Sequence, residues 1–374
     1  MKQERTSAMY HEAMRTGTKI FATAPMIDWS DTHFRVFARQ LTHHALLYTE
    51  MIVADAILRG NRDRLLGYEP VEHPLALQLG GNDPAKLAEA ARIGEGFGYD
   101  EINLNVGCPS DRVQSGTFGA CLMREPQLVA DCVAAMKAAV KIPVTVKCRI
   151  GVDEQDPEIA LRDLVARLRA SGVDAVWVHA RKAWLQGLSP KENRDIPPLD
   201  YGLVRRVKAE NPDLFIGLNG GLHTLAQALA AMDHPDGALD GAMLGRAAYH
   251  DSALLADVDA VFARPPTGAA RLNRRFAPPS LRGGEEGVPR DPAFWNGVRD
   301  AMMAHAARHI AGGGRLNHVT RHMVGLFQGF AGARRYRQIL SSEATRPGAG
   351  PEVIAAAFAA VDLDPKAGEA KLAG

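Results

Sequence analysis

Short apolar runs of strand character recur along the first 250 residues and alternate with amphipathic stretches of helical spacing. Segments such as 83–98, 126–141 and 158–172 show that helical spacing. Strands that alternate with helices predict parallel βαβ units, and eight such units in about 240 residues predict a (β/α)₈ TIM barrel. The eight strand-like runs occupy 19–25, 45–50, 74–79, 101–105, 143–148, 175–179, 214–219 and 241–245.

A doubly wound open sheet is the alternative arrangement for the same alternation of strands and helices. That fold normally places a glycine-rich fingerprint directly after the first strand. Here the stretch that follows the first strand reads TAPMIDWSD and contains no glycine. The sequence therefore favours the barrel, an α/β fold.

The composition changes after residue 263. Residues 264–292 are rich in Pro, Gly and Arg and have no periodicity, which is typical of a linker or a long surface loop. The three segments 294–311, 318–340 and 351–361 then have helical patterning and predict a small all-α domain. We therefore divide the chain into a polar N-terminal extension (1–17), a barrel domain (18–263), the linker (264–292), a helical domain (293–362) and a tail (363–374).

Charge is balanced over the whole chain but not over its C-terminal part. The net charge is +1, which indicates no polyanionic partner for the chain as a whole. Residues 294–346 nevertheless contain only two acids, Asp300 and Glu343, against eight arginines. This asymmetry indicates a surface for a polyanion, with a solvated helix face as the alternative. The arginines are Arg299, Arg308, Arg315, Arg321, Arg334, Arg335, Arg337 and Arg346.

The cysteines and the N-terminus indicate a cytoplasmic protein. The four cysteines lie between Cys108 and Cys148 with no CxxC pair, which argues against a disulfide framework and against a metal site. The first 19 residues are polar and lack the apolar core of a signal peptide. No run of eighteen apolar residues is present, so we expect no membrane span.

Candidate chemistry lies where the predicted strands end, because TIM-barrel active sites are built at the carboxyl ends of the strands. Nearly every predicted strand ends on a polar or conformationally special residue, which a purely structural scaffold does not require. In chain order these ends are Ala24-Pro25-Met26, Glu50, Gln78, Asn105 with Gly107-Cys108-Pro109, Lys147, His179, Asn219-Gly220-Gly221 and Gly245-Arg246.

The last two strand ends predict a phosphate site. Loops after strands 7 and 8 commonly bind phosphate through glycine N–H groups and a helix N-terminus. LNGGLHTLAQAL supplies Gly220 and Gly221 ahead of a helix, and LGRAAYHDSALL adds Arg246, which suits bidentate contact with a phosphate. Each glycine pair alone could be a simple turn. Together they favour a ligand with one phosphate, which fits FMN better than a dinucleotide.

Lys147 and His179 end the fifth and sixth strands. A cation there can stabilise negative charge on the N1–C2=O edge of a reduced flavin. Gln78 could bond the pyrimidine side of the flavin, and Pro25 and Met26 could lie along its edge. A structural ion pair is the alternative for Lys147, and a hydrogen-bonded core histidine is the alternative for His179.

Cys108 lies between Gly107 and Pro109, just past the fourth strand. A thiol can be a nucleophile, a metal ligand or a general acid. The sequence has no paired His/Asp motif nearby and no second cysteine at ligand spacing. A protonated thiol that acts as an acid opposite a hydride donor remains, whereas the other three cysteines suit small buried apolar positions.

With these motifs in place, the sequence resembles the tRNA-dihydrouridine synthases, and within them the dihydrouridine synthase A branch. The likeness covers roughly residues 18–362. It is carried by stretches such as APMIDWSDTHFR, INLNVGCPSDRVQSGTFGACLM, VWVHARKAWLQGLSPKENRDIPPLDY and RHMVGLFQGFAGARRYRQIL. The resemblance implies an FMN barrel and a helical domain that together bind tRNA. It also implies that NADPH reduces the flavin, that a hydride passes from flavin N5 to uracil C6, and that the cysteine at the Cys108 position protonates C5.

The resemblance also implies the site residues and the partners. For tRNA, Asn105 would hold the target uracil, a D-loop uridine near position 20, and the tRNA body would contact Lys191, Arg194, Arg334 and Arg337. The expected partners are tRNA and NADPH, with no membrane, and we expect a monomer. The expected flavin contacts are Pro25, Met26, Ile27, Gln78, Lys147, His179, Asn219, Gly220, Gly221, Gly245 and Arg246.

Two other functions stay open at the level of sequence. The first is an FMN barrel that acts on a free pyrimidine, which leaves the arginine-rich domain unexplained. The second is an RNA-binding protein or chaperone on an inactive barrel, which a purified protein without flavin absorbance would support.

Overall fold

The computed structural model describes residues 9–110, 117–262 and 292–363, whose contacts divide into two compact units. The first unit contains the described residues of 9–28 and 46–245. The second combines the C-terminal helices with 29–45 and 246–262, two stretches that the sequence analysis assigned to the barrel domain. Residues 264–291 of the predicted linker and 364–374 of the predicted tail lie outside the described residues.

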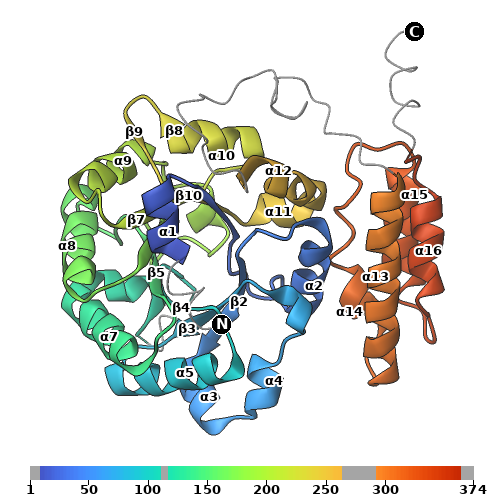
Figure 1. The fold of residues 1–374 in the computed structure, drawn as a ribbon, viewed down its shortest axis with the longest axis horizontal. Helices are drawn as coiled ribbons and strands as arrows, with labels where there is room; N and C mark the ends of the chain where they lie inside the picture. The colour runs from blue at the N-terminus through green and yellow to red at the C-terminus, as the bar shows by residue number, and fades with distance from the viewer. Residues whose placement is uncertain (1–8, 111–116, 263–291, 364–374) are drawn as a thin grey trace. The chain divides into compact units, whose positions relative to one another are not determined.

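The first unit is built on eight parallel strands in the order β1-β10-β7-β6-β5-β4-β3-β2. The two ends of this sheet meet, because Leu46 accepts a 3.0 Å hydrogen bond from Thr23 N and donates one of 2.9 Å to Phe21 O. The strands therefore form a closed ring with helices outside it (Figure 1), which confirms the predicted TIM barrel and all eight predicted strands. Their bounds are β1 Ile20–Thr23, β2 Leu47–Val53, β3 Leu75–Gly80, β4 Glu101–Val106, β5 Val144–Arg149, β6 Ala175–His179, β7 Phe215–Asn219 and β10 Gly241–Leu244.

The outer helices begin where the sequence supplies start signals. Asp83 accepts hydrogen bonds from the N–H groups of Ala85 and Lys86, and Pro84 occupies the first position of α5. Such an Asp-Pro pair both satisfies free N–H groups and presets the backbone angle of the first helical residue. The helices of this unit are α3 Ala54–Arg59, α4 Arg62–Leu66, α5 Pro84–Phe97, α7 Pro126–Ala139, α8 Pro157–Ala170, α9 Tyr201–Glu210 and α10 Leu225–Met232, with 3₁₀ turns at Pro70–Glu72, Gly119–Arg124 and Glu192–Arg194 and a short hairpin of β8 Asp233–His234 and β9 Gly237–Ala238.

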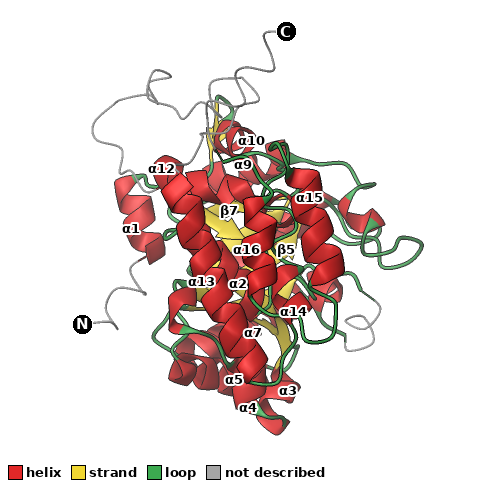
Figure 2. Cartoon of the chain, turned by 90° about the vertical axis from the view of Figure 1, so that its right-hand side faces the viewer, coloured by secondary structure: helices red, strands yellow, loops and turns green. Residues whose placement is uncertain are grey.

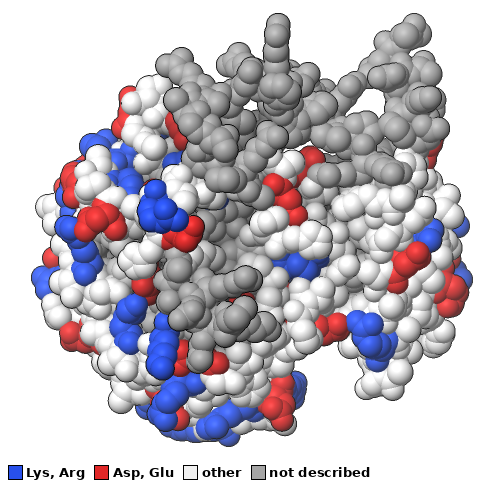
Figure 3. Space-filling model, in the orientation of Figure 1, with Lys and Arg blue, Asp and Glu red and all other residues white. Residues whose placement is uncertain are grey.

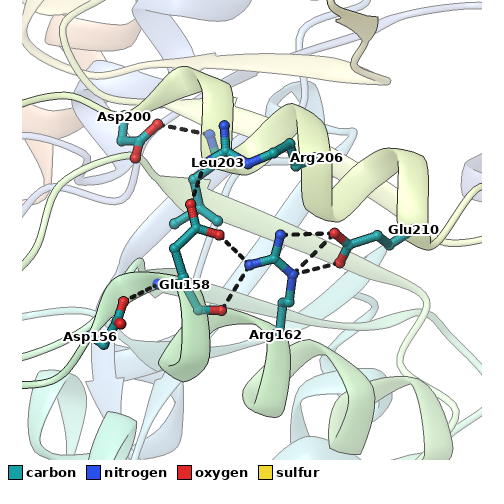
Figure 4. Close-up of polar contacts among 7 residues, drawn as sticks. All are labelled: Asp156, Glu158, Arg162, Asp200, Leu203, Arg206 and Glu210. Carbon is teal, nitrogen blue, oxygen red and sulfur yellow. Dashed lines mark hydrogen bonds and ion pairs between the residues drawn. The ribbon is translucent and has the colours of Figure 1, made fainter.

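Ion pairs join the outer helices α8 and α9. Acidic and basic side chains are intermixed over the visible face of the barrel in Figure 3. Arg162 on α8 contacts Glu158 of its own helix and binds both carboxylate oxygens of Glu210 on α9, at 2.8 and 3.0 Å from its Nε (Figure 4). Arg206 on α9 reaches back to Glu158. Exposed pairs of this kind contribute at most about 1 kcal/mol each, so they align the two helices more than they stabilise the barrel.

The N-terminal extension contains a helix, α1 (Met9–Thr16), whose role the sequence analysis did not foresee. Tyr10 and Ala13 are buried, and the ring of Tyr10 packs edge-on against Phe215 with 4.7 Å between centroids. The Tyr10 hydroxyl donates a 2.6 Å hydrogen bond to Oε2 of Glu101, the first residue of β4. Helix α1 therefore closes the end of the barrel at which the strands begin, and it crosses the ring of strands in Figure 1.

The second unit is helical and packs around Phe327. The ring of Phe327 lies 5.1 Å from that of Trp295, 4.9 Å from that of Tyr336 and 5.2 Å from that of Phe358. Helices α13 and α16 lie side by side in this unit (Figure 2). None of the helices in the described chain combines the length and apolar character that a membrane span needs. The elements are α2 Thr32–Leu41, α11 Arg246–His250, a 3₁₀ turn Ser252–Asp257, α12 Val258–Phe262, α13 Pro292–Ala311, α14 Leu316–Thr320, α15 Ala333–Gln338, a π-helical turn Ile339–Glu343 and α16 Glu352–Ala359.

The prediction of one of the three C-terminal helices is wrong. Helices α13 and α16 confirm the predictions for 294–311 and 351–361, but the predicted helix 318–340 is interrupted by turns between α14 and α15. Gly329 and Gly332 adopt φ angles of +87° and +86°, which a right-handed helix does not contain. A Cβ at Gly332 would lie 1.9 Å from the carbonyl oxygen of Ala360, so the close approach of α16 requires glycine there.

Replacing Tyr10 with Phe tests how much α1 contributes to the barrel. The variant leaves the buried carboxyl of Glu101 with one donor fewer, so we expect the free energy of unfolding to fall by about 1–3 kcal/mol. Urea unfolding followed by fluorescence measures it. The matched control is His11→Ala on the exposed side of the same helix, which should change stability little, and equal losses for both variants would contradict the assignment.

Histidines gather where α2 meets α13 in the second unit. Nδ1 of His33 lies 2.8 Å from Nε2 of His305, and the rings of His33 and His309 lie 4.3 Å apart between centroids. The pKa of His33 is lowered to about 3, mainly by burial and also by the neighbouring His309, His305 and His322, while Asp31 opposes the shift. His33 is therefore neutral in the folded unit.

The low pKa of His33 predicts acid sensitivity of the second unit. An unfolded histidine takes up a proton below about pH 6.5, whereas folded His33 does not, so the stabilisation present above that pH is lost as the pH falls through 6.5 towards 3. We expect the urea concentration at the unfolding midpoint to decrease when the pH is lowered from 7.5 to 5.5. The His33→Gln variant should lose less over that range than the wild type, and His43→Gln, at an exposed position, should match the wild type. An unchanged pH dependence in His33→Gln would contradict the prediction.

Candidate active site

The strand register brings the predicted residues of the barrel together at the carboxyl end of the sheet. Asn105 on β4 is the register partner of Lys147 on β5. Two residues further along β5, Arg149 is the register partner of His179 on β6, which in turn is the partner of Asn219 on β7. Because alternate residues of a barrel strand point inward, these side chains share the mouth of the barrel.

Asn105 organises the loop that carries Cys108. Its Oδ1 accepts hydrogen bonds of 3.0 Å from the backbone N–H groups of both Gly107 and Cys108. The carbonyl of Cys108 accepts a 2.9 Å bond from Ala120 N, and the thiol lies 3.4 Å from the hydroxyl of Ser110. Cys108 is partly exposed, so its thiol is held at the strand end where a substrate can reach it.

The other cysteines are placed as structural residues. Cys132 and Cys148 are buried, and burial raises the pKa of each thiol to about 12. Burial also raises the pKa of Cys121, which is partly exposed. Cys108 is therefore the partly exposed cysteine that follows β4 at the barrel mouth.

The amide of Gln78 is held in one orientation. Its Oε1 accepts a 2.8 Å hydrogen bond from Nδ2 of Asn105, and its Nε2 donates one of 2.8 Å to Oδ1 of Asn103. An amide nitrogen carries two hydrogens, so the second N–H of Gln78 is available for an acceptor. A carbonyl of a flavin ring is an acceptor of this kind.

Lys147 is a cation that lacks an anionic partner among the described residues. The pKa of its ammonium group is lowered to about 8, mainly by burial and also by the nearby charge of Arg149. No hydrogen bond or ion pair joins it to another described residue, so the structural ion pair that the sequence left open is not seen there. A partly buried cation of this type fits a ligand that bears or develops negative charge.

The loop after β7 forms a cradle of backbone N–H groups. Gly220 and Gly221 adopt φ angles of +103° and +70°, and a Cβ at Gly220 would lie 3.1 Å from the ring of His179. Within the described chain the N–H groups of these glycines donate no hydrogen bond. Thr224 Oγ1 caps the following helix α10 through Gln227 N, so the glycine N–H groups lie just ahead of a helix that is already capped.

Six further predicted flavin contacts differ in how they are placed. Nδ2 of Asn219 donates a 2.7 Å hydrogen bond to the carbonyl of Met243, so this amide joins β7 to β10. A Cβ at Gly245 would lie 3.3 Å from that of Ala24 and 3.4 Å from Sδ of Met26, so a side chain there would be tightly packed. Arg246 begins α11 and belongs to the second unit. Pro25 and Met26 are partly exposed after β1, and Ile27 is half exposed.

The predicted tRNA contacts other than Asn105 are surface residues on two different elements. Lys191 and Arg194 are exposed in the loop after β6, at a turn organised by the buried Asn193. The side chain of Asn193 accepts a 2.7 Å bond from Trp184 N and donates one of 2.8 Å to Trp184 O. Arg334 and Arg337 are exposed on α15 of the second unit.

A protein-family model matches most of this chain. The family model described as "Dihydrouridine synthase (Dus)" matches residues 22–361, which is most of the chain. The chain belongs to the dihydrouridine synthase family. The expected family membership is thereby confirmed, and the barrel mouth around Cys108 lies within the matched region.

Curated relatives match the chain over nearly its whole length, and each is named tRNA-dihydrouridine(20/20a) synthase. The relative from Shewanella oneidensis is 51% identical over 346 residues, which cover 92% of this chain and 95% of that protein. The one from Xanthomonas axonopodis pv. citri is 50% identical over 341 residues, 91% and 93% of the two chains. The one from Escherichia coli K12 is 47% identical over 355 residues, 94% of each chain.

Arg149 is a residue of this dihydrouridine synthase site that the sequence analysis missed. Its buried guanidinium donates to the carbonyl of Gly107 at 3.2 Å and to that of Asn193 at 2.7 Å, and burial lowers its pKa to about 10. It therefore ties the Cys108 loop to the loop that carries Lys191. The signal in the sequence was its position two residues after Lys147, on the same side of β5.

Proposed function

We propose that this chain is an NADPH-dependent, FMN-containing tRNA-dihydrouridine synthase that reduces the C5=C6 bond of D-loop uridines around positions 20 and 20a. The observation that carries the proposal is the geometry of Cys108, whose loop Asn105 holds at the mouth of a barrel of this family. The shared name of the relatives supports tRNA as the substrate, and their full-length match supports the same activity for the whole chain.

The residues at the mouth fit a flavin mononucleotide. The free N–H groups of Gly220 and Gly221 suit its phosphate, Lys147 suits the electron-rich edge of the reduced ring, and the second N–H of Gln78 suits a ring carbonyl. The remaining contacts that we assign are Pro25, Met26, Ile27, His179, Asn219, Gly245 and Arg246.

Reduction of the uracil C5=C6 bond requires a hydride at one carbon and a proton at the other. When bound, the flavin reduced by NADPH supplies the hydride, which goes to C6. The chain supplies the proton, which passes from the thiol of Cys108 to C5 and leaves a thiolate that solvent reprotonates. Asn105 places this thiol through the backbone of its loop, and its amide holds the uracil.

We assign tRNA contacts to arginines of the second unit and, in the first unit, to Lys191 and Arg194. Arg334 and Arg337 lie on one face of α15 and pair with no acid among the described residues. Arg335 on the same helix instead bonds Glu343, with 3.4 Å between Nη2 and Oε1. The free cations are therefore the ones suited to phosphate contacts.

We place the enzyme in the cytoplasm as a monomer. The four cysteines are free, which fits a reducing compartment. The monomeric state stays a prediction, which light scattering of the purified protein tests.

Cys108→Ala separates the two halves of the reaction. The variant lacks the proton donor but keeps the residues assigned to the flavin, so NADPH should reduce its flavin at the normal rate. Dihydrouridine formation should fall by at least about a hundredfold, the low end of the range for a lost general acid. Stopped-flow flavin absorbance and mass spectrometry of the tRNA measure the two steps.

The control is Cys121→Ala, which removes a partly exposed thiol from the segment after the Cys108 loop. It should support both steps. Normal turnover of tRNA by Cys108→Ala would overturn the acid assignment.

Two arginines of α15 should govern affinity for tRNA. Arg334→Ala and Arg337→Ala should each weaken binding and lower the slope of log K against log salt by roughly one, because one phosphate contact is lost. The FMN content should not change. Arg335→Ala is the matched control on the same helix and should bind more nearly as the wild type does, so the same slope loss in all three variants would count against the assigned pair.

A further inference from the structure

A continuous chain of hydrogen-bonded side chains runs inside the barrel from its floor to the Cys108 loop. Thr145 donates its hydroxyl hydrogen to Oε1 of Glu101. Asn103 Nδ2 donates to Thr145 Oγ1 at 2.7 Å, and Gln78 Nε2 donates to Asn103 Oδ1 at 2.8 Å. Asn105 Nδ2 then donates to Gln78 Oε1 at 2.8 Å. We refer to Glu101, Thr145, Asn103, Gln78 and Asn105 as the polar column.

Every bond in the polar column points the same way. Each donor lies on the side of the mouth and each acceptor on the side of the floor. At the mouth, Oδ1 of Asn105 accepts the backbone N–H groups of Gly107 and Cys108. At the floor, Glu101 also accepts hydrogen bonds from Tyr10 and Tyr48, both at 2.6 Å.

The common direction makes the amide orientations interdependent. If Gln78 turned over, its NH₂ group would face the NH₂ group of Asn105. Asn105 could relieve that clash only by turning as well, which would point its NH₂ group at the N–H groups of Gly107 and Cys108. The Cys108 loop would then lose the acceptor that holds it. A buried donor without an acceptor is costly, so the column holds one orientation throughout.

The floor of the column keeps its acceptor across the physiological pH range. Burial raises the pKa of Glu101 to about 7, although the hydroxyls of Thr145, Tyr10 and Tyr48 favour the ionised form. A carboxyl group retains a carbonyl oxygen when it is protonated. Thr145 can therefore donate to Glu101 in either form, and the direction of the column is preserved.

We propose that Glu101, acting through Thr145 and Asn103, is a positioning residue for the reaction: it sets the orientation of the Gln78 and Asn105 amides and thereby places the Cys108 loop. The effect on dihydrouridine formation rests on the proposed function, whereas the effect on the loop does not. None of Glu101, Thr145 and Asn103 is exposed enough to touch a substrate, since each is completely buried.

The test interrupts the column at two positions. Asn103→Leu removes the amide that joins Gln78 to Thr145, and Thr145→Val removes the hydroxyl that joins Asn103 to Glu101 with almost no change of shape. In the FMN-loaded protein without tRNA, we expect iodoacetamide to alkylate Cys108 about five times faster than in the wild type, because the loop has lost its fixed acceptor. Peptide mass spectrometry reads the rate at Cys108 alone.

Kinetics with tRNA provide the second measurement. In both variants kcat should fall at least about tenfold, because the thiol is displaced from the reacting carbon, while KM for tRNA stays within about twofold. Glu101→Gln keeps a carbonyl acceptor and should retain the wild-type alkylation rate and kcat. Glu101→Leu removes the acceptor and should behave as Asn103→Leu does.

Tyr10→Phe is the matched control, since it removes a bond to Glu101 on the floor side and leaves the column complete. It should lower stability without changing the alkylation of Cys108. The proposal is overturned if folded Asn103→Leu and Thr145→Val alkylate at the wild-type rate, or if Tyr10→Phe changes the rate as much as they do. Faster alkylation in the column variants of an enzyme that forms no dihydrouridine would support the column and refute the proposed function.

Discussion

A buried carboxyl group at the floor of the barrel imposes the constraint on which the rest of the first unit depends. Glu101 is completely buried, and a buried carboxyl is tolerated only when its oxygens are hydrogen-bonded. Thr145 meets that demand from the neighbouring strand β5, and Tyr48 and Tyr10 meet it from β2 and from α1. The N-terminal helix is thus part of the barrel's interior, since its tyrosine both satisfies the carboxyl and packs on the apolar cluster at the floor.

The same requirement for hydrogen-bonded partners applies to the buried polar side chains along the barrel axis, up to the end that carries Cys108. Each polar residue on the inner face of β4 must find a partner, and the alternation of the strand places those residues one above another. The series ends at Asn105, whose remaining acceptor holds the backbone of Cys108. Near this ordered amide lie groups that have no protein partner in the described chain, namely the ammonium of Lys147 and the N–H groups of Gly220 and Gly221. The mouth thus combines amides that are hydrogen-bonded within the protein with donors that are not. This combination suits a negatively charged ligand.

In the second unit, ion pairing decides which arginines remain for a partner. Arg321 binds Asp31 at 2.5 Å, although Asp31 comes from a stretch 290 residues earlier in the chain. Arg299 binds Asp300 and Arg335 binds Glu343, whereas Arg334 and Arg337 pair with no acid in the described chain. Fewer arginines are therefore available to a partner than the eight that the sequence contains in residues 294–346. Among the arginines of the described chain that pair with no acid, Arg334 and Arg337 share one face of α15, where they suit a phosphate backbone.

The sequence by itself determined the eight strands, the barrel, the gathering of Asn105, Lys147 and His179 at one end, and the family. These features follow from local periodicity and from the rule that parallel strands end on the same side. Only the tertiary structure decided that the polar extension contributes Tyr10 to Glu101, 91 residues away, and that glycines with positive φ interrupt the helix expected at 318–340. It also revealed Arg149 and the polar column. The reason is physical: a hydrogen-bond partner is chosen by distance in space, and no local pattern in the chain records which distant residue will lie within 3 Å.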